Sequence, residues 1–291
     1  MRVLVMYNPI SGRGKSSLLA QAIAALLQSI PCDVELVQTH PSSPESWLTP
    51  KLQFKPDAVI AVGGDGTLRQ VASGLVGTSI PLYHAACGTE NLFAKSMGMS
   101  STPKVVIAAT ENAKAQTIDT ATANGEFLVL MASVGFDAGV VADLAKHRGT
   151  SITHLSYIAP IIRQLFKWNL PVITIEVDGE EIVSNTKGWA VIANSNAYAR
   201  GLNPAIDADN TDGKLDVVFF PLKSRFQLWK WIRLMKRGTQ LQQPEVVYVK
   251  GESVSVRTTT PSPWQIDGDS IGNAIEMQIL CVPKSLSVLV N

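Results

Sequence analysis

The sequence predicts an α/β protein of two domains: an N-terminal doubly wound parallel sheet over residues 1–118 and a C-terminal, mainly antiparallel β-sandwich over residues 119–291. Two observations carry this prediction. In the first part, apolar runs alternate with helical patterns, as in a parallel sheet that is covered by helices on both faces. Beyond about Lys114, short β-rich runs follow one another, separated by turns rich in Gly, Asn and Asp. The last residues of the chain are left open as a segment that returns to the first domain.

Strand and helix patterns alternate through the first domain. Residues 15–29 predict a helix, because Leu and Ile side chains recur there at helical spacing. A second helix is expected over residues 67–75. The expected strands are residues 2–7, 33–38, 58–62 and 80–84.

The second domain consists mainly of short expected strands. Turn pairs such as Asp178-Gly179 and Asp212-Gly213 separate them, which favours antiparallel neighbours. Helical patterns interrupt the strands near residues 151–167 and 222–237. The expected strands are residues 127–132, 172–177, 189–193, 215–220, 253–257 and 274–280.

Composition and charge narrow the function classes. Hydrophobic residues make up 46% and charged residues 17%, which supplies a packed core and excludes global disorder. The formal net charge of +1 gives no electrostatic footprint for nucleic acid, so no nucleic-acid partner is expected. The three cysteines form no disulfide framework, and no apolar run is long enough to span a bilayer. We therefore expect a cytoplasmic protein.

Three glycine-bearing loops follow expected strands. The strongest is Gly-Gly-Asp-Gly-Thr at residues 63–67, which leaves an apolar strand and opens a helix. Glycines let the backbone approach a phosphate, the helix N-terminus supplies free N–H donors, and Asp65 adds a carboxylate suited to a magnesium nucleotide. An ordinary strand-to-helix turn is the alternative.

The other two loops are weaker signals taken alone. Residues 8–16 end in Gly-Lys-Ser but lack the first glycine of a P-loop, because Pro9 stands there. Residues 88–92 begin with Gly-Thr after another strand. Since the C-terminal ends of parallel strands share one edge of the sheet, three such loops together favour a phosphate site.

The ordered motifs resemble one family. Asn-Pro-x-Ser-Gly from Asn8, Gly-Gly-Asp-Gly-Thr from Gly63 and Gly-Thr-x-Asn from Gly88 are similar to the diacylglycerol kinase catalytic family, which includes bacterial lipid kinases, ceramide kinases and sphingosine kinases. The resemblance continues to the C-terminal part through Gly135-Phe-Asp-Ala138, Asn194, Asp212-Gly-Lys-Leu-Asp216 and Asp267-Gly268. It implies an ATP-dependent kinase that phosphorylates a lipid hydroxyl, such as that of diacylglycerol, and that uses Mg²⁺.

The resemblance also implies roles for individual residues. The implied nucleotide-binding positions are Asn8, Thr39, Gly63, Gly64, Gly66, Thr67, Leu68, Arg69, Gln70 and Thr89. The implied catalytic positions are Asp65, Asp267 as the general base, and Asp269, which stands where a version of the motif has Glu. Asp212 matches a structural magnesium ligand, with the backbone carbonyls of Asp209 and Lys214 completing the protein's share of the site. Without the resemblance, Asp267-Gly268 is more simply a β-turn.

Two departures from the family pattern leave alternatives open. Gln70 and Leu92 stand where many members have a carboxylate, so one alternative is a catalytically impaired protein that binds nucleotide or lipid. Another is an NAD-kinase-like small-molecule kinase, which shares the central motif. The Asn-Glu pair of those enzymes has no counterpart in Ala193-Asn-Ser-Asn-Ala197.

A basic helix offers a contact with membranes. Residues 223–237 carry six basic side chains and no acid, with Phe226 and Trp229 among the basic side chains opposite an apolar face. Such a helix can lie on an anionic bilayer, or its basic residues can simply be solvated while its apolar face packs on the domain. We expect peripheral membrane association with a lipid substrate as partner; a homodimer is left open.

Overall fold

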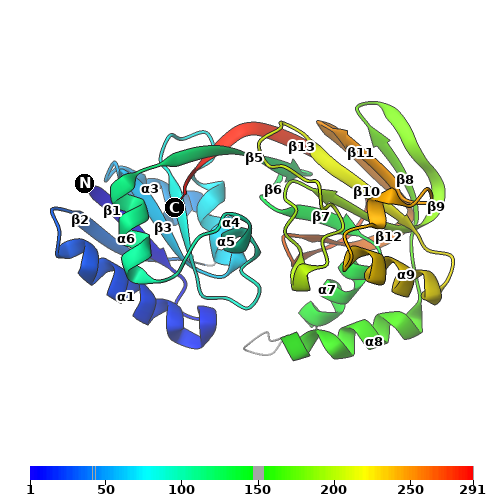
Figure 1. Ribbon diagram of the computed structural model, residues 1–291, viewed down its shortest axis with the longest axis horizontal. Coiled ribbons are helices and arrows are strands. Elements are labelled where there is room, and N and C mark those ends of the chain that lie inside the picture. The colour runs from blue at the N-terminus through cyan, green and yellow to red at the C-terminus, as the bar shows by residue number, and fades with distance from the viewer. Residues whose placement is uncertain (41, 43, 147–153, 291) are drawn as a thin grey trace. The chain divides into compact units, whose positions relative to one another are not determined.

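The computed structural model describes residues 1–40, 42, 44–146 and 154–290. The chain divides into two compact units (Figure 1). Unit 1 comprises residues 1–118 and 284–291, and unit 2 comprises residues 119–283. The strands β5 (Ala115–Ala123) and β13 (Asp269–Leu289) each contribute residues to both units.

Unit 1 is built on a parallel sheet with strand order β4-β3-β1-β2. Its strands are β1 (Arg2–Tyr7), β2 (Asp33–Gln38), β3 (Ala58–Gly63) and β4 (Leu82–Ala86). Its helices are α1 (Lys15–Gln28), α2 (Pro44–Trp47), α3 (Thr49–Leu52), α4 (Asp65–Ser73), α5 (Leu92–Ser96) and α6 (Pro103–Asn112).

Both faces of this sheet are buried. One face packs against α1 and α6, which lie side by side in Figure 1, with Val5, Ile60 and Ile23 in the core between them. Leu4 and Met6 alternate with Val5 along β1, so they point to the opposite face, and they are also fully buried. The predicted doubly wound parallel sheet is thus confirmed.

In its described residues, unit 2 consists mainly of antiparallel strands, with α-helices between them. Besides parts of β5 and β13, its strands are β6 (Glu126–Leu128), β7 (Met131–Val134), β8 (Val172–Val177), β9 (Glu180–Ala193), β10 (Leu215–Pro221), β11 (Val247–Gly251) and β12 (Ser253–Ile266). Its helices are α7 (Phe136–Lys146), α8 (Ile158–Lys167) and α9 (Arg225–Met235). Within the described residues, no helix is long and apolar enough to cross a bilayer.

Two long strands of unit 2, β9 and β12, each pair with different strands along their two halves. The first half of β9 pairs with β8, and its second half pairs with β7 and β10. Strand β12 likewise pairs with β8 at residues 254–258 and with β7 at residues 264–266. These antiparallel pairings enclose a core that contains Ile175, Ile192 and Trp264. The predicted antiparallel β-sandwich is confirmed.

One predicted strand is wrong. Residues 127–132 form the end of β6 and the start of β7 rather than one strand. The N–H groups of Val129 and Leu130 donate to the Asp267 carboxylate, so they do not continue a ladder. In unit 1 the fourth strand begins at Leu82 instead of residue 80, because the preceding proline has no N–H to donate.

The two helices predicted in unit 2 are shorter than their patterns. The pattern over residues 222–237 corresponds to α9, which spans Arg225–Met235. The pattern near residues 151–167 corresponds to a short turn at His154–Tyr157 followed by α8. Residues 151–153 of that pattern lie outside the described residues.

Candidate active site

The implied nucleotide-binding residues follow the C-terminal ends of four parallel strands of unit 1. Asn8 follows β1, Thr39 follows β2, and Gly63 ends β3. Thr89 lies in the turn after β4. Backbone hydrogen bonds continue the sheet into these loops, since Asn8 N donates to Val62 O and Thr39 N donates to Tyr7 O. The loops therefore gather at one edge of the sheet, where α/β proteins bind their ligands.

The three glycine-bearing loops pack against one another. The hydroxyl oxygens of Ser11 and Thr67 lie 3.4 Å apart. A Cβ on Gly12 would lie 2.5 Å from the carbonyl oxygen of Cys87, and a Cβ on Gly88 would lie 2.7 Å from the Cα of Gly64. The backbones thus approach each other as closely as only glycine permits.

Helix α4 begins within the central motif. Gly64 is its N-cap, in extended conformation, and no side chain caps its first turn. The N–H groups of the first turn, which includes Gly66 and Thr67, have no partner within the helix and can bind an anion. Leu68 is fully buried, so its side chain packs in the core. Arg69 and Gln70 are half-buried on the next turn.

The Asp65 carboxylate ties α4 to α5. Its Oδ2 accepts the N–H of Leu92 at 3.0 Å, and its Oδ1 accepts the N–H of Phe93 at 3.2 Å. Asn91, just before α5, accepts the N–H of Gly88 at 2.8 Å through its side chain. Asp65 is thereby held in a fixed position, and Leu92 contributes its backbone N–H where the family pattern often has a carboxylate.

Asp267 occupies a tight hairpin turn in unit 2. Ile266 of β12 pairs directly with Asp269 of β13, and the two residues between them, Asp267 and Gly268, both have positive φ, at 49° and 86°. This is the geometry of a type I′ turn, which favours Asp-Gly. Asp269 therefore begins β13 beside the turn.

The Asp267 carboxylate also has a long-range structural role. Its oxygens accept the N–H groups of Val129, Leu130 and Met131 at 2.8 to 2.9 Å. Asp267 is 9% exposed. The carboxylate is thus held rigidly, with its negative charge stabilised by three donors.

Two amide side chains support this turn. Gln265 accepts the N–H of Gly268 at 2.8 Å and donates to the hydroxyl of Ser133 at 2.7 Å. Asn194, fully buried, donates to the carbonyl oxygens of Asp119 and Val129. Gln265 could not be singled out from the sequence, because one glutamine in a β-strand carries no signal until its partners are known.

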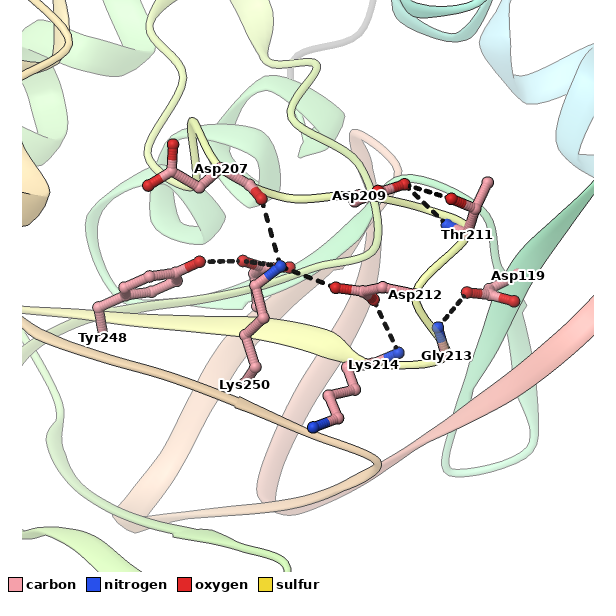
Figure 2. A network of polar contacts seen from close by, with 10 residues as sticks. Asp119, Asp207, Asp209, Thr211, Asp212, Gly213, Lys214, Tyr248 and Lys250 are labelled. Atoms are coloured by element: carbon pink, nitrogen blue, oxygen red, sulfur yellow. Dashed lines mark hydrogen bonds and ion pairs between the residues drawn. The ribbon is translucent and has the colours of Figure 1, made fainter.

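The residues expected to hold a structural magnesium form a different arrangement (Figure 2). Asp212 Oδ2 pairs with the ammonium of Lys250 at 2.8 Å, and its Oδ1 accepts the N–H of Lys214 at 3.0 Å. The Asp209 carboxylate turns onto Thr211, whose N–H and hydroxyl it accepts. In the part of the chain that the structure describes, no three His, Cys, Asp or Glu residues are grouped to hold a metal ion. Both Asp212 carboxylate oxygens thus already have partners within the chain, and the magnesium site at Asp209, Asp212 and Lys214 stays a prediction.

Opposing effects act on the charges of this network. Burial raises the pKa of Asp216, while hydrogen bonds from Tyr248 and the charge of Lys250 lower it in part. Burial lowers the pKa of Lys250, but its hydrogen bond to Asp212 and the charge of Asp216 outweigh burial and raise it overall. Lys250 thus stays an ammonium among carboxylates.

Comparison with known proteins places both units. Residues 2–123 match the diacylglycerol kinase catalytic domain, and residues 131–290 match the YegS C-terminal NAD kinase beta sandwich-like domain. A diacylglycerol kinase of Mycobacterium tuberculosis is 27% identical over 99% of this chain and 94% of its own length. An uncharacterized protein of Synechocystis sp. is 29% identical over 79% of this chain, and the match spans 54% of that protein.

Solved structures show the same fold. The crystal structure of a candidate diacylglycerol kinase from Bacillus anthracis superposes with a TM-score of 0.77, at 18% identity, over 100% of this chain and 95% of that one. An NAD kinase from Archaeoglobus fulgidus, in complex with ATP, superposes with a TM-score of 0.56, at 14% identity, over 100% of this chain and 94% of that one.

Proposed function

Because this chain belongs to the diacylglycerol kinase catalytic family, with a YegS-type C-terminal β-sandwich-like domain, we propose that it transfers the γ-phosphate of ATP to a lipid hydroxyl. The observation that carries the nucleotide part is the contact among the three glycine-bearing loops at the first turn of α4. Phosphoryl transfer asks for a positioned phosphate, neutralised charge and an oriented hydroxyl.

In this proposal, residues of unit 1 bind the nucleotide. The free N–H groups of α4 and the close backbone approach of Gly64 and Gly88 suit the phosphates. Asn8, Thr39 and Thr89 stand at the ends of neighbouring strands and would contact the rest of the nucleotide. Magnesium would enter as part of the MgATP substrate, with Asp65 supplying negative charge near it.

Asp267 would act as the general base in this proposal. A base must be held within reach of the acceptor hydroxyl with its charge intact. The three N–H donors fix the Asp267 carboxylate in one position at the turn. Asp269, next to the turn, adds a second negative charge.

An apolar and basic surface of unit 2 supports a lipid acceptor. On α8, Ile158, Ile162 and Phe166 recur every fourth residue and are exposed, Phe166 by 75%. On α9, Phe226 is 84% exposed and Trp229 is 59% exposed. The guanidinium of Arg225 donates to the carbonyl oxygen of Phe166 at 3.0 Å, so the two helices meet. We call these five apolar side chains the α8–α9 surface.

Basic side chains flank this surface. Arg233, Lys236 and Arg237 line a shallow hollow with Trp229 and Ile232. Exposed apolar groups beside cations are the combination that an anionic bilayer binds. We therefore propose that the protein meets its lipid acceptor at a membrane surface.

An NAD-kinase-like activity is the competing proposal, favoured by the shared central motif. Against it, the Asn194 side-chain amide in unit 2 already donates hydrogen bonds to two backbone carbonyl oxygens. The next residue is Ser195, whereas NAD kinases have Glu after the corresponding Asn. One assay separates the candidates: γ-labelled ATP incubated with mixed membrane lipids and, separately, with NAD.

The expected result is label in the organic extract of the lipid reaction and none on NAD. Label on NAD alone would contradict the lipid kinase activity and support the NAD-kinase-like activity instead. Label on neither, with ATP still bound, would favour a binding protein in which Gln70 and Leu92 mark lost catalysis.

A further inference from the structure

A lysine ammonium lies at the centre of the acidic cluster in unit 2 (Figure 2). Lys250 on β11 donates to Asp212 Oδ2 at 2.8 Å and to the carbonyl oxygen of Asp207 at 3.3 Å. Its nitrogen also lies 3.5 Å from Asp216 Oδ1. An ammonium has three N–H donors, and three oxygens surround this one.

These three oxygens are of the kind that a hard cation prefers. Two come from carboxylates and one from a backbone carbonyl, which together are typical ligands of Mg²⁺ and Ca²⁺. They come from the loop before β10 and from β10 itself, so a cation among them fastens that loop to the sheet. Here the fastening cation is part of the chain.

The buried carboxylate explains why a cation is required. Asp216 is fully buried on β10, and beyond the ammonium its Oδ1 accepts the hydroxyl of Tyr248. A buried carboxylate without an opposite charge is strongly unfavourable. Lys250, only 29% exposed, supplies that charge from the neighbouring strand.

The same ammonium keeps a metal away. A divalent ion among these three oxygens would need the Asp212 oxygen that Lys250 already binds, and the positive charge of Lys250 would repel it. We propose that Lys250 replaces a divalent cation in this chain, and that the loop of residues 207–214 is therefore fastened to β10 and β11 without any metal.

The test follows exchange of backbone amide hydrogens in the full chain by mass spectrometry, in a peptide that covers residues 205–216. Nucleotide is absent, so that no MgATP forms. The wild-type peptide should exchange at the same rate in EDTA and in millimolar Mg²⁺ or Ca²⁺. Lys250→Ser should exchange several-fold faster in EDTA, and the divalent ion should restore protection, because the smaller side chain frees the three oxygens.

Two variants assign the effect to this cluster. Lys214→Ser removes a positive charge from the same loop, but its side chain points away from the cluster in Figure 2, so protection should stay as in the wild type. Adding Asp212→Asn to Lys250→Ser should abolish the rescue by the ion. Lys250→Arg keeps the charge and should stay metal-independent.

Three results would overturn the proposal. The first is wild-type protection that depends on a divalent ion and on Asp212. The second is a Lys250→Ser variant that exchanges like the wild type. The third is faster exchange in Lys250→Ser that no divalent ion reverses, which would make Lys250 an ordinary ion-pair partner rather than a replacement for a metal.

Discussion

Gly63 and Gly64 are neighbours that are glycines for different reasons. A Cβ on Gly63 would lie 2.4 Å from the Thr67 hydroxyl oxygen, so this position has no space inside the protein. A Cβ on Gly64 would lie 3.4 Å from the Cα of Gly88, which is an ordinary contact. The fold therefore requires the first glycine, whereas the second leaves room for a ligand at the N-cap of α4.

Substitution by alanine should separate these two roles. Gly63→Ala should destabilise unit 1 by about 1–3 kcal/mol, as overpacking usually does. Gly64→Ala should change stability little but weaken ATP binding at least tenfold, because its methyl group occupies the approach to the first-turn N–H groups. Thermal unfolding and ATP titration of both variants check this. Unchanged ATP affinity in Gly64→Ala would mean that the phosphates of ATP do not bind at this turn.

Unit 2 contains a second Asp-Gly turn that serves as a control for Asp267. Asp178 and Gly179 join β8 to β9, also with positive φ, and the Asp178 carboxylate accepts the N–H groups of Glu252 and Ser253. The sequence does not distinguish the two turns, because both are Asp-Gly pairs between β-strands. Only the resemblance to the family points to Asp267.

Asp→Asn at both turns should distinguish structure from catalysis. Each variant replaces an acceptor oxygen by an amide group facing backbone N–H donors, so each should lose about 1–3 kcal/mol of stability. Asp267→Asn should in addition lower the rate of phosphoryl transfer at saturating ATP by at least a hundredfold, with ATP affinity little changed. Kinetics under conditions where both variants are folded check this. Equal rate losses in the two variants would reduce Asp267 to a turn residue.

His84 predicts a pH dependence for unit 1. It is fully buried on β4, its Nε2 lies 3.2 Å from Gly63 O, and burial lowers its pKa. The folded protein thus keeps His84 neutral at pH values where the unfolded chain binds a proton. Stability contributed by this difference is present above about pH 6.5 and falls by up to about 1.4 kcal/mol per pH unit below it.

Urea unfolding of the wild type and of His84→Gln at about pH 7.5 and about pH 5.5 measures this contribution. The variant keeps an N–H donor for Gly63 but does not titrate, so acid should destabilise it less than the wild type. The comparison isolates His84, because burial raises the pKa of Asp137 and Asp216 in both proteins and acts in the opposite direction. Equal acid sensitivity of the two proteins would contradict it.

At the scale of elements, α9 has one face packed in unit 2 and another face exposed to solvent. Leu228, Trp231 and Met235 are buried against unit 2, as expected for the apolar face. Lys230 pairs with Glu245 at 2.8 Å, so its charge is already matched. Arg233, Lys236 and Arg237 line the hollow beside Trp229 and remain the candidates for contact with lipid headgroups.

Replacing Arg233, Lys236 and Arg237 together by Gln should weaken binding to anionic vesicles by about two orders of magnitude. Each cation near an anionic surface contributes about 1 kcal/mol, and salt screens it. Lys230→Gln on the same helix should have little effect. Vesicle co-sedimentation at low and high salt is the measurement. If the triple variant binds like the wild type, the membrane contact lies elsewhere.

The elements show where sequence patterns suffice. Strands β1 and β2 lie where their residue patterns predict them, because burial on a sheet leaves a regular pattern. The break at residues 129–130 was not predictable, because it depends on the carboxylate of Asp267 more than a hundred residues away. The glycine loops were likewise predictable, whereas the Lys250 cluster was not, since nothing between Lys250 and Asp212 in the sequence signals that they meet.

At the scale of the whole chain, unit 1 is completed by the last residues. Leu286, Val288 and Leu289 are fully buried, and Val288 pairs with Leu82 of β4. Leu289 belongs to the core that contains Val5 and Ile60. The same strand, β13, contributes Ile279 to the core of unit 2. One strand therefore carries core side chains of both units.

Alanine substitutions on β13 should act on different units. Leu289→Ala should accelerate amide exchange in β1 and α1 of unit 1, and Ile279→Ala should do so in β9 and β12 of unit 2. Each removes a buried side chain, which typically costs about 2–5 kcal/mol. Peptide-resolved hydrogen exchange under native conditions reports both units at once. Acceleration confined to one unit in each variant means that the units open separately. Equal acceleration in both units would mean that the chain unfolds as one cooperative structure. The units divided at residues 118 and 283 would then have no separate free energies of unfolding.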